Sequence, residues 1–230
     1  QGGLSVGAGE GLGFNGGTLS LLEPPPATMI VESGSAPADG NGTTGDARIL
    51  LDNSLGGVQG FVTAVTHDPA GITLEGISLG VDTAAANAEF EITNIYTDGG
   101  TLGVVLDFNS PFAGQTIPTG TGLHLASYTY SCNDSNIYTE GEAAPPAASS
   151  ALTLADGVLG SPALANVIVV GGLSVSPLKS DGSFTCDPVP VPAEDTILWM
   201  ETKFDTEEGN YAYLGQTGDL CFYYKDDDDY

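Results

Sequence analysis

Apolar and polar residues alternate along most of the middle of the chain. The alternation is almost unbroken in residues 72–79 and 89–95, whereas residues 101–108 are nearly all apolar. Strict alternation is typical of a strand with one buried face, and a short apolar run is typical of a strand buried on both faces. The pattern predicts strands at residues 47–52, 58–66, 72–79, 89–95, 101–108, 123–132, 150–154, 167–170 and 173–175.

Turn-forming residues separate these predicted strands. They include Asp68–Gly71, Asp98–Gly100 and Asp181–Gly182, where Gly, Pro and Asp supply the backbone angles that turns require. Short strands at a spacing of about ten residues indicate a sandwich or barrel. Residues 84–88 are a single helical turn, too little for a doubly wound α/β fold. We therefore predict an all-β fold, a single jelly-roll-like β-sandwich of about nine strands.

The sequence divides into three regions. Residues 1–45 form a Gly/Pro-rich N-terminal arm, residues 46–186 the predicted sandwich, and residues 187–230 an acidic C-terminal extension. The alternating prolines of residues 188–192 predict a stiff, extended linker. The extension is β-prone in residues 196–204, 211–214 and 220–224, so we expect it to pack on the sandwich or on another subunit.

The charge balance excludes one class of partner and leaves two interpretations open. The chain carries 30 acidic residues against four Lys and Arg, a formal net charge of −26. A polyanion of this size lacks the cations that bind nucleic acid or an anionic membrane. The acidity serves solubility, or some of the carboxylates bind calcium, which prefers oxygen ligands.

The start of the chain and its hydropathy indicate a secreted protein. Gln1 stands in place of Met, so we interpret the sequence as a mature form from which a leader has been removed. No apolar stretch reaches the roughly 18 residues of a membrane helix. We expect an extracellular, cell-surface-associated protein without membrane insertion.

The three cysteines predict one disulfide. Cys132 and Cys186 each end a strand-like run and enter a polar or proline-rich loop, a geometry that suits a bridge between strand ends. Cys221 is then left over, either free or paired with another chain. No two cysteines have the spacing of a zinc, thioredoxin-type or c-type haem site.

Short motifs give no catalytic, cofactor or metal site. Residues 3–7 and 76–80 match G-x-S-x-G, and residues 11–16 match G-x-G-x-x-G, but none lies in the strand–turn–helix context that these motifs require. His67 and His124 stand alone and are predicted to be structural hydrogen-bonding residues. We therefore do not expect an enzyme.

Two further surface features carry expectations of their own. Asn41 and Asn133 begin Asn-x-Ser/Thr sequons in predicted loops, which makes them candidate glycosylation sites. Residues 226–229 are four consecutive aspartates, predicted to be a solvated terminus or a calcium-binding tail.

Several stretches of the middle region resemble a known family. They are residues 58–61, 65–69, 72–76, 103–108, 125–128 and 166–175. In them the chain is similar to the cohesin-like, carbohydrate-binding-type β-sandwiches of bacterial extracellular proteins. The resemblance excludes both terminal regions. It implies a jelly-roll-like sandwich that holds protein partners or belongs to a larger surface assembly, and it implies no catalytic residues.

These observations lead to two functional hypotheses. The first is an extracellular structural subunit that assembles with copies of itself into a fibre or surface layer by β-strand addition. Gly2–Val6 and Gly171–Val175 have identical sequences, so the arm repeats a predicted sandwich strand. The alternative is a cohesin-like recognition module that binds a glycan or a docking protein. The residues predicted to mediate self-association are Leu4, Val6, Leu19, Leu21, Phe222, Tyr223 and Tyr224.

Overall fold

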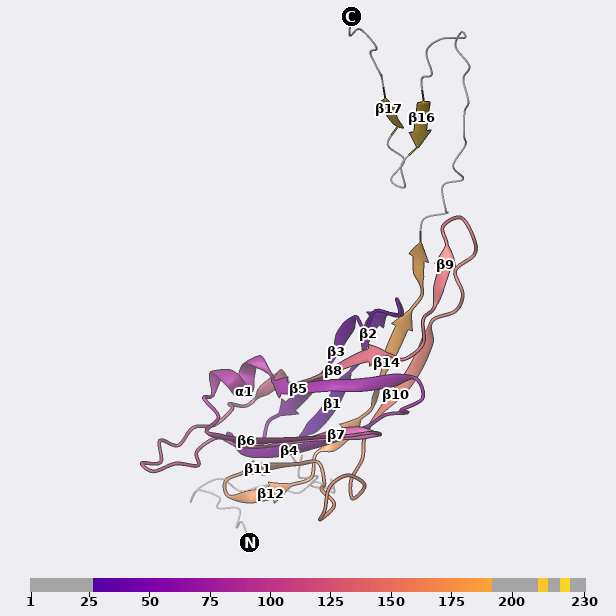
Figure 1. Ribbon diagram of the computed structural model, residues 1–230. Coiled ribbons are helices and arrows are strands. Elements are labelled where there is room, and N and C mark those ends of the chain that lie inside the picture. Colours follow the sequence, from indigo (N-terminus) through magenta and orange to yellow (C-terminus); the bar gives the residue numbers. More distant parts are fainter. Residues whose placement is uncertain (1–26, 192–210, 215–219, 224–230) are drawn as a thin grey trace, which may run out of the picture.

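The structure is a computed structural model that describes residues 27–191 and the backbone of residues 211–214 and 220–223. Two β-sheets pack face to face, and Figure 1 shows these layers nearly edge-on. The predicted all-β sandwich is confirmed. It contains more than the predicted nine strands, because further short strands extend both sheets.

One layer is a five-stranded sheet in the order β13–β1–β3–β8–β5. All neighbours run antiparallel except β1 and β13, which run parallel. The bounds of its strands are β1 Thr28–Glu32, β3 Thr44–Asn53, β5 Ile72–Leu79, β8 Gly120–Cys132 and β13 Leu178–Ser180.

The other layer is an eight-stranded sheet organised around β4. One edge of β4 pairs with β7, which in turn pairs with β6. The other edge pairs with β11 over its first half and with β10 at its end, followed by β14 and β2. The bounds are β2 Gly34–Pro37, β4 Val58–Thr66, β6 Phe90–Tyr96, β7 Gly99–Val105, β10 Ala148–Leu154, β11 Val167–Val170, β12 Leu173–Val175 and β14 Gly182–Asp187.

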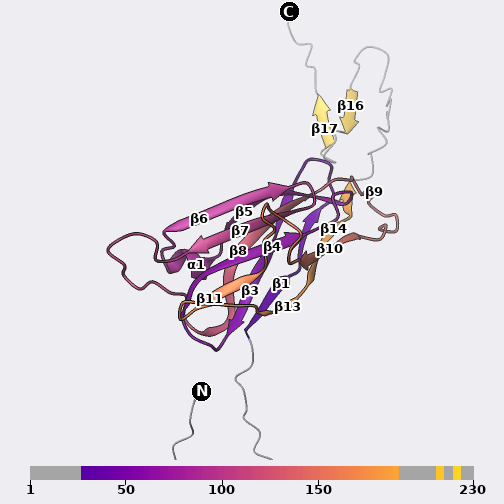
Figure 2. The ribbon, with the colours of Figure 1, turned by 90° about the horizontal axis from the view of Figure 1, so that it is seen from below.

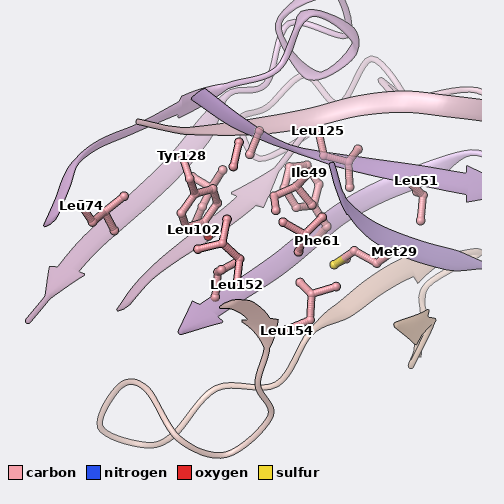
Figure 3. Close-up of a cluster of buried hydrophobic side chains, with 14 of the residues drawn as sticks. Met29, Ile49, Leu51, Phe61, Leu74, Leu102, Leu125, Tyr128, Leu152 and Leu154 are labelled. Carbon is pink, nitrogen blue, oxygen red and sulfur yellow. The ribbon is translucent and has the colours of Figure 1, made fainter. Parts of the chain in front are cut away.

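The core lies between the two sheets (Figure 3). Alternate residues of each strand point inward, and the largest buried side chains include Tyr128, Tyr130, Phe61 and Phe184. The hydroxyl groups of Tyr128 and Thr63 lie 2.8 Å apart across the core, so the buried tyrosine has a polar partner.

The sandwich begins earlier in the sequence than predicted. Strands β1 and β2 precede residue 46, and β1 buries Met29 and Val31 in the core. The assignment of residues 27–45 to an N-terminal arm is therefore wrong. The alternation within β1 covers only five residues and lies beside Gly- and Pro-rich sequence, which obscured it.

The predicted proline linker is a strand over part of its length. Strand β15 (Val189–Val191) pairs in parallel with β9 (Ile137–Thr139). The amide of Val189 donates to the Asn136 carbonyl, and the carbonyl of Val191 accepts from the Glu140 amide. Pro190 lies between these two hydrogen-bonding residues, so no hydrogen bond between the strands is lost through its missing N–H.

Three smaller features complete the described part of the chain. Helix α1 spans Val81–Ala85, three residues earlier than the predicted turn, where the Thr83 hydroxyl donates to the Leu125 carbonyl. Strands β16 (Tyr211–Leu214) and β17 (Leu220–Tyr223) form an antiparallel hairpin. The predicted disulfide is present between Cys132 on β8 and Cys186 on β14, and it joins the two sheets.

Candidate binding face

The outer surface of β6, β7, β4 and β11 is apolar. Residues opposite one another on neighbouring strands point to the same side of a sheet, and two such rows cross this surface. Phe61 and Val104 face the core, so their chain neighbours face outward. Figure 2 shows the strands from a second direction. The rows consist of Phe90, Val105, Gly60 and Val169, and of Ile92, Gly103, Val62 and Val167. We call these eight residues the apolar face.

The two glycines keep the apolar face flat. A Cβ atom on Gly60 would lie 2.6 Å from the Val104 carbonyl oxygen, and one on Gly103 would lie 3.3 Å from Ile92 Cγ2. The position of Gly60 therefore has no room for a side chain. Backbone and short valine side chains form the middle of the face, with larger side chains at its β6 edge.

A substantial part of the apolar face is exposed to solvent. Phe90, Ile92 and Val105 have 39%, 52% and 38% of their surface exposed. A hollow of about 400 Å³ lies over the strands, and Val62, Val105, Val167 and Val169 line it together with Gln59 and Asp107. Contiguous exposed apolar surface of this kind marks binding sites in proteins.

The loop of residues 106–117 forms one rim of the face (Figure 1). The Phe108 ring lies 5.0 Å from the Phe90 ring, and Phe112 is 71% exposed. The Glu89 carboxylate accepts hydrogen bonds from the amides of Phe108 and Asn109, at 2.9 and 2.5 Å. The loop is therefore tied to the start of β6 and presents aromatic side chains beside the face.

The loop of residues 155–166 covers the sheet beyond the other end of the face, where the buried Leu159 side chain lies against Gly99 of β7. Asn166 Oδ1 accepts a hydrogen bond of 2.7 Å from the Ala64 amide. The Asp156 carboxylate accepts from the Asn166 amide and side chain and from Lys179 Nζ. The Lys179 hydrogen bond is the main reason that the pKa of Asp156 is lowered to about 2. The apolar face thus ends at a well-anchored loop.

The surroundings of the face are acidic. Glu89 lies directly before β6, and Asp107 lines the hollow. In residues 27–191 the Lys and Arg residues are Arg48 and Lys179. Arg48 forms an ion pair with Glu32, and Lys179 forms one with Asp156. A partner therefore meets negative potential around an apolar centre.

Neither histidine lies on the apolar face. The ring nitrogens of His67 make no hydrogen bond of ordinary geometry, so the predicted hydrogen-bonding role is wrong for that side chain, whereas the His124 ring has hydrogen-bond partners. The His67 ring packs edge-on against Tyr130 with centroids 5.3 Å apart, and its backbone amide donates to the Asp98 carbonyl. Burial lowers the pKa of His67, although Asp98, the Thr97 carbonyl and Asp68 oppose this effect. His124 Nε2 lies 3.1 Å from both the Ala126 carbonyl and the Ser127 hydroxyl.

The residues predicted to mediate self-association fall largely outside the described part. Leu4, Val6, Leu19, Leu21 and Tyr224 are not described, and Phe222 and Tyr223 lie in β17, of which only the backbone is described. The candidate glycosylation sites are both described: Asn41 lies in the loop between β2 and β3, and Asn133 directly follows β8.

Within the described residues, no three His, Cys, Asp or Glu side chains come together as a metal site. The calcium expectation for residues 226–229 lies outside those residues. None of the helices in the described part is long and apolar enough to cross a membrane.

The sequence did not single out the apolar face. It predicted the strand at residues 89–95 and a twice-buried strand at residues 101–108. Strand β7 is indeed mostly buried, yet Val105 at its end is open to solvent. The available signal was the apolar alternation of β6, in which Phe90 and Ile92 have no charged residue on their own side of the strand.

Comparisons with known proteins identify the fold. No family model and no curated protein sequence matches the chain. Solved structures do match: the sixth cohesin of scaffoldin B from Acetivibrio cellulolyticus, in complex with a dockerin, is 12% identical with a TM-score of 0.51, over 70% of this chain and 99% of that one. The OlpC cohesin from Clostridium thermocellum, also with a dockerin, is 14% identical with a TM-score of 0.50, over 75% and 100%. The chain has a cohesin-like β-sandwich in its middle region.

Proposed function

We propose that this protein is an extracellular recognition module that binds a docking protein through its apolar face. The observation that carries the proposal is the exposed, flat, valine-lined surface on β6, β7, β4 and β11, bounded by two anchored loops. Such a surface is desolvated at little cost because it presents few polar groups. The role is binding rather than catalysis.

The chemistry of the face favours a protein partner over a glycan. Sugar rings need several hydrogen-bonding side chains beside an aromatic platform, whereas the rows of the apolar face contain Val, Ile, Phe and Gly. An apolar centre with a charged rim is the usual composition of a protein–protein interface. The structural neighbours named above were each solved with a dockerin, so a dockerin-type module is the partner we propose.

The acidic charge of the protein indicates that the partner carries basic side chains. Glu89 lies at the start of β6, Asp107 lines the hollow, and the chain carries a net charge of −26. We expect the partner to place apolar side chains over Val62 and Ile92 and basic side chains at the rim. Its association should be faster at low salt, since exposed charges steer encounter and salt screens them.

The disulfide supports an extracellular location. Cys132 and Cys186 form a bond that persists in oxidising compartments and is rare in the cytosol.

Site-specific crosslinking tests the proposal. A photo-reactive amino acid is placed at Ile92, which is 52% exposed on the face, and in a matched protein at Leu178, which is 57% exposed on β13 of the other sheet. Each is irradiated with the extracellular proteins of the source organism, and crosslinked proteins are identified by mass spectrometry. We expect a protein with a dockerin-type module to crosslink at residue 92 alone.

Calorimetry with the purified partner then measures affinity. Ile92→Asp should weaken binding roughly tenfold or more, because it buries a carboxylate in the interface. Leu178→Asp serves as the control and should bind like wild type. Equal crosslinking at both positions, or wild-type affinity of Ile92→Asp, would contradict the proposal.

Self-assembly by strand addition is a second candidate, favoured by one observation. Residues 2–6 repeat the sequence of residues 171–175, and Leu173–Val175 form β12, an edge strand antiparallel to β11. A copy of that sequence suits the same position on a neighbouring molecule. Deletion of residues 1–22 should then leave a folded monomer in mass photometry. Unchanged assembly of the truncated protein in electron micrographs would exclude this candidate.

A further inference from the structure

The structure separates the two Asn-x-Ser/Thr sequons by what their side-chain amides do. N-glycosylation joins the amide nitrogen of Asn to a sugar, so the nitrogen must be accessible and free to leave its hydrogen bonds. The two sequons lie at the same end of the sandwich, because a Cβ atom on Gly40 would lie 3.3 Å from Ser135 Cβ. Both asparagines are exposed, but the hydrogen bonds of their side chains differ.

The Asn133 side chain holds the turn between β4 and β5 in place by hydrogen bonds. Its Nδ2 donates to the carbonyls of Pro69 and Ala70, at 2.8 and 3.3 Å, and its Oδ1 accepts a hydrogen bond of 2.6 Å from the Thr73 hydroxyl. The Asn133 backbone amide also donates to the Gly71 carbonyl. This asparagine thereby fixes the turn between β4 and β5, and a sugar on Nδ2 would displace the turn.

The Asn41 side chain does not hold a turn between two strands in place. Residues 40–44 are all exposed, and the space beside Gly42 is open: no atom outside residues 41–43 lies within 4 Å of a Cβ atom built there. The Asp39 carboxylate shapes the loop by accepting from the Thr43 hydroxyl and the Asn41 backbone amide, and it also interacts with the Asn41 side chain. These hydrogen bonds lower the pKa of Asp39. These contacts lie within the exposed loop itself, so the Asn41 side chain can leave them without displacing a turn between two strands.

We propose that Asn41 is an N-glycosylation site of the folded protein and that Asn133 is not. The co-reactant is an oligosaccharide carried on a lipid pyrophosphate. A bond forms between Asn41 Nδ2 and the first sugar carbon, the bond from that carbon to the pyrophosphate breaks, the amide nitrogen loses a proton, and the lipid pyrophosphate leaves. No electron transfer is involved.

The position of Asn41 is compatible with a bound partner. Its loop follows β2, the edge strand that β14 and β10 separate from β4. A glycan on this loop extends from the β2 edge of the eight-stranded sheet, which is opposite to the β6 edge, and leaves the apolar face uncovered. The inference is independent of the proposed docking function.

The test uses the purified, folded, disulfide-bonded full chain. It is incubated with an oligosaccharyltransferase and its lipid-linked oligosaccharide, and then analysed by intact mass and glycopeptide sequencing. We expect one glycan, on Asn41, absent from Asn41→Gln and from Thr43→Ala. The reduced, denatured chain should accept glycan at Asn133 as well.

Peptide mapping of the wild-type chain assigns the glycan even if a variant folds poorly. A glycan on Asn133 of the folded chain would overturn the proposal. So would a folded chain that stays unmodified at Asn41.

Discussion

The Tyr128 hydroxyl lies 2.8 Å from the Thr63 hydroxyl, and this hydrogen bond joins the five-stranded sheet to the eight-stranded sheet inside the core. Both side chains are fully buried. Tyr128→Phe removes the tyrosine hydroxyl and leaves the buried Thr63 hydroxyl without this hydrogen-bond partner and without access to water. We expect the free energy of unfolding in urea to fall by about 1–3 kcal/mol.

A double-mutant cycle with Thr63→Val checks the cause. Replacing both partners by apolar groups removes the unsatisfied hydroxyl, so the double variant should lose less than the sum of the two single losses. Strict additivity would mean that the two hydroxyl groups do not act together.

The Cys132–Cys186 bond closes a segment with a sequence separation of 54 residues and links the two sheets. A crosslink of this kind restricts the unfolded chain. Replacing both cysteines by Ser should lower the free energy of unfolding by about 2–4 kcal/mol, measured by chemical denaturation. Cys221→Ser is the control and should leave the stability of the sandwich unchanged, because that residue takes no part in the bond.

Periodicity alone revealed most of the strands of the two sheets. Residues 72–79 coincide with β5, and residues 167–170 and 173–175 coincide with β11 and β12. Strand β1, whose inward residues are Met29 and Val31, was missed because its alternation lies in a Gly- and Pro-rich setting that predicts an extended arm.

The candidate face depends on information that a strand pattern does not contain. Whether an outward apolar residue is exposed is decided by what lies over the sheet. Thr101 on β7 is buried, whereas Val105 on the same strand is open beyond the covering loop. The exposed fraction of β7 therefore follows from the path of residues 155–166, which places Leu159 against Gly99 at the start of β7. Sequence alternation does not encode that path.

Protonation of His67 should destabilise the fold in a defined pH range. Burial lowers the pKa of His67 below its ordinary value of 6.5, so the unfolded chain binds this proton more readily than the folded chain does. The stability linked to His67 is therefore fully present above pH 6.5 and is lost as the pH falls from there toward the folded-state pKa. Urea unfolding at several pH values between 7 and 5 measures this slope.

His67→Phe keeps an aromatic ring against Tyr130 and removes the titrating group. Its stability should change less than that of wild type between pH 7 and 5. Asp156 does not interfere in this range, because its pKa is lowered from 3.8 to about 2 and its contribution is lost only between those values as the pH falls. Parallel slopes for wild type and His67→Phe would exclude His67 as the cause.

Salt should stabilise the protein through its excess of carboxylates. The chain has 30 acidic residues and four basic ones, and in residues 27–191 both cations already have a carboxylate partner. Most carboxylates therefore repel one another, and this repulsion is screened at distances beyond about 10 Å in 0.1 M salt. We expect the Tm to rise as NaCl increases from low to molar concentration, by roughly 2–4 °C for each kcal/mol gained. An uncharged osmolyte at matched osmolality is the control for solvent effects. A Tm that falls with NaCl would show that the two ion pairs of Arg48 and Lys179 contribute more to stability than the repulsion subtracts.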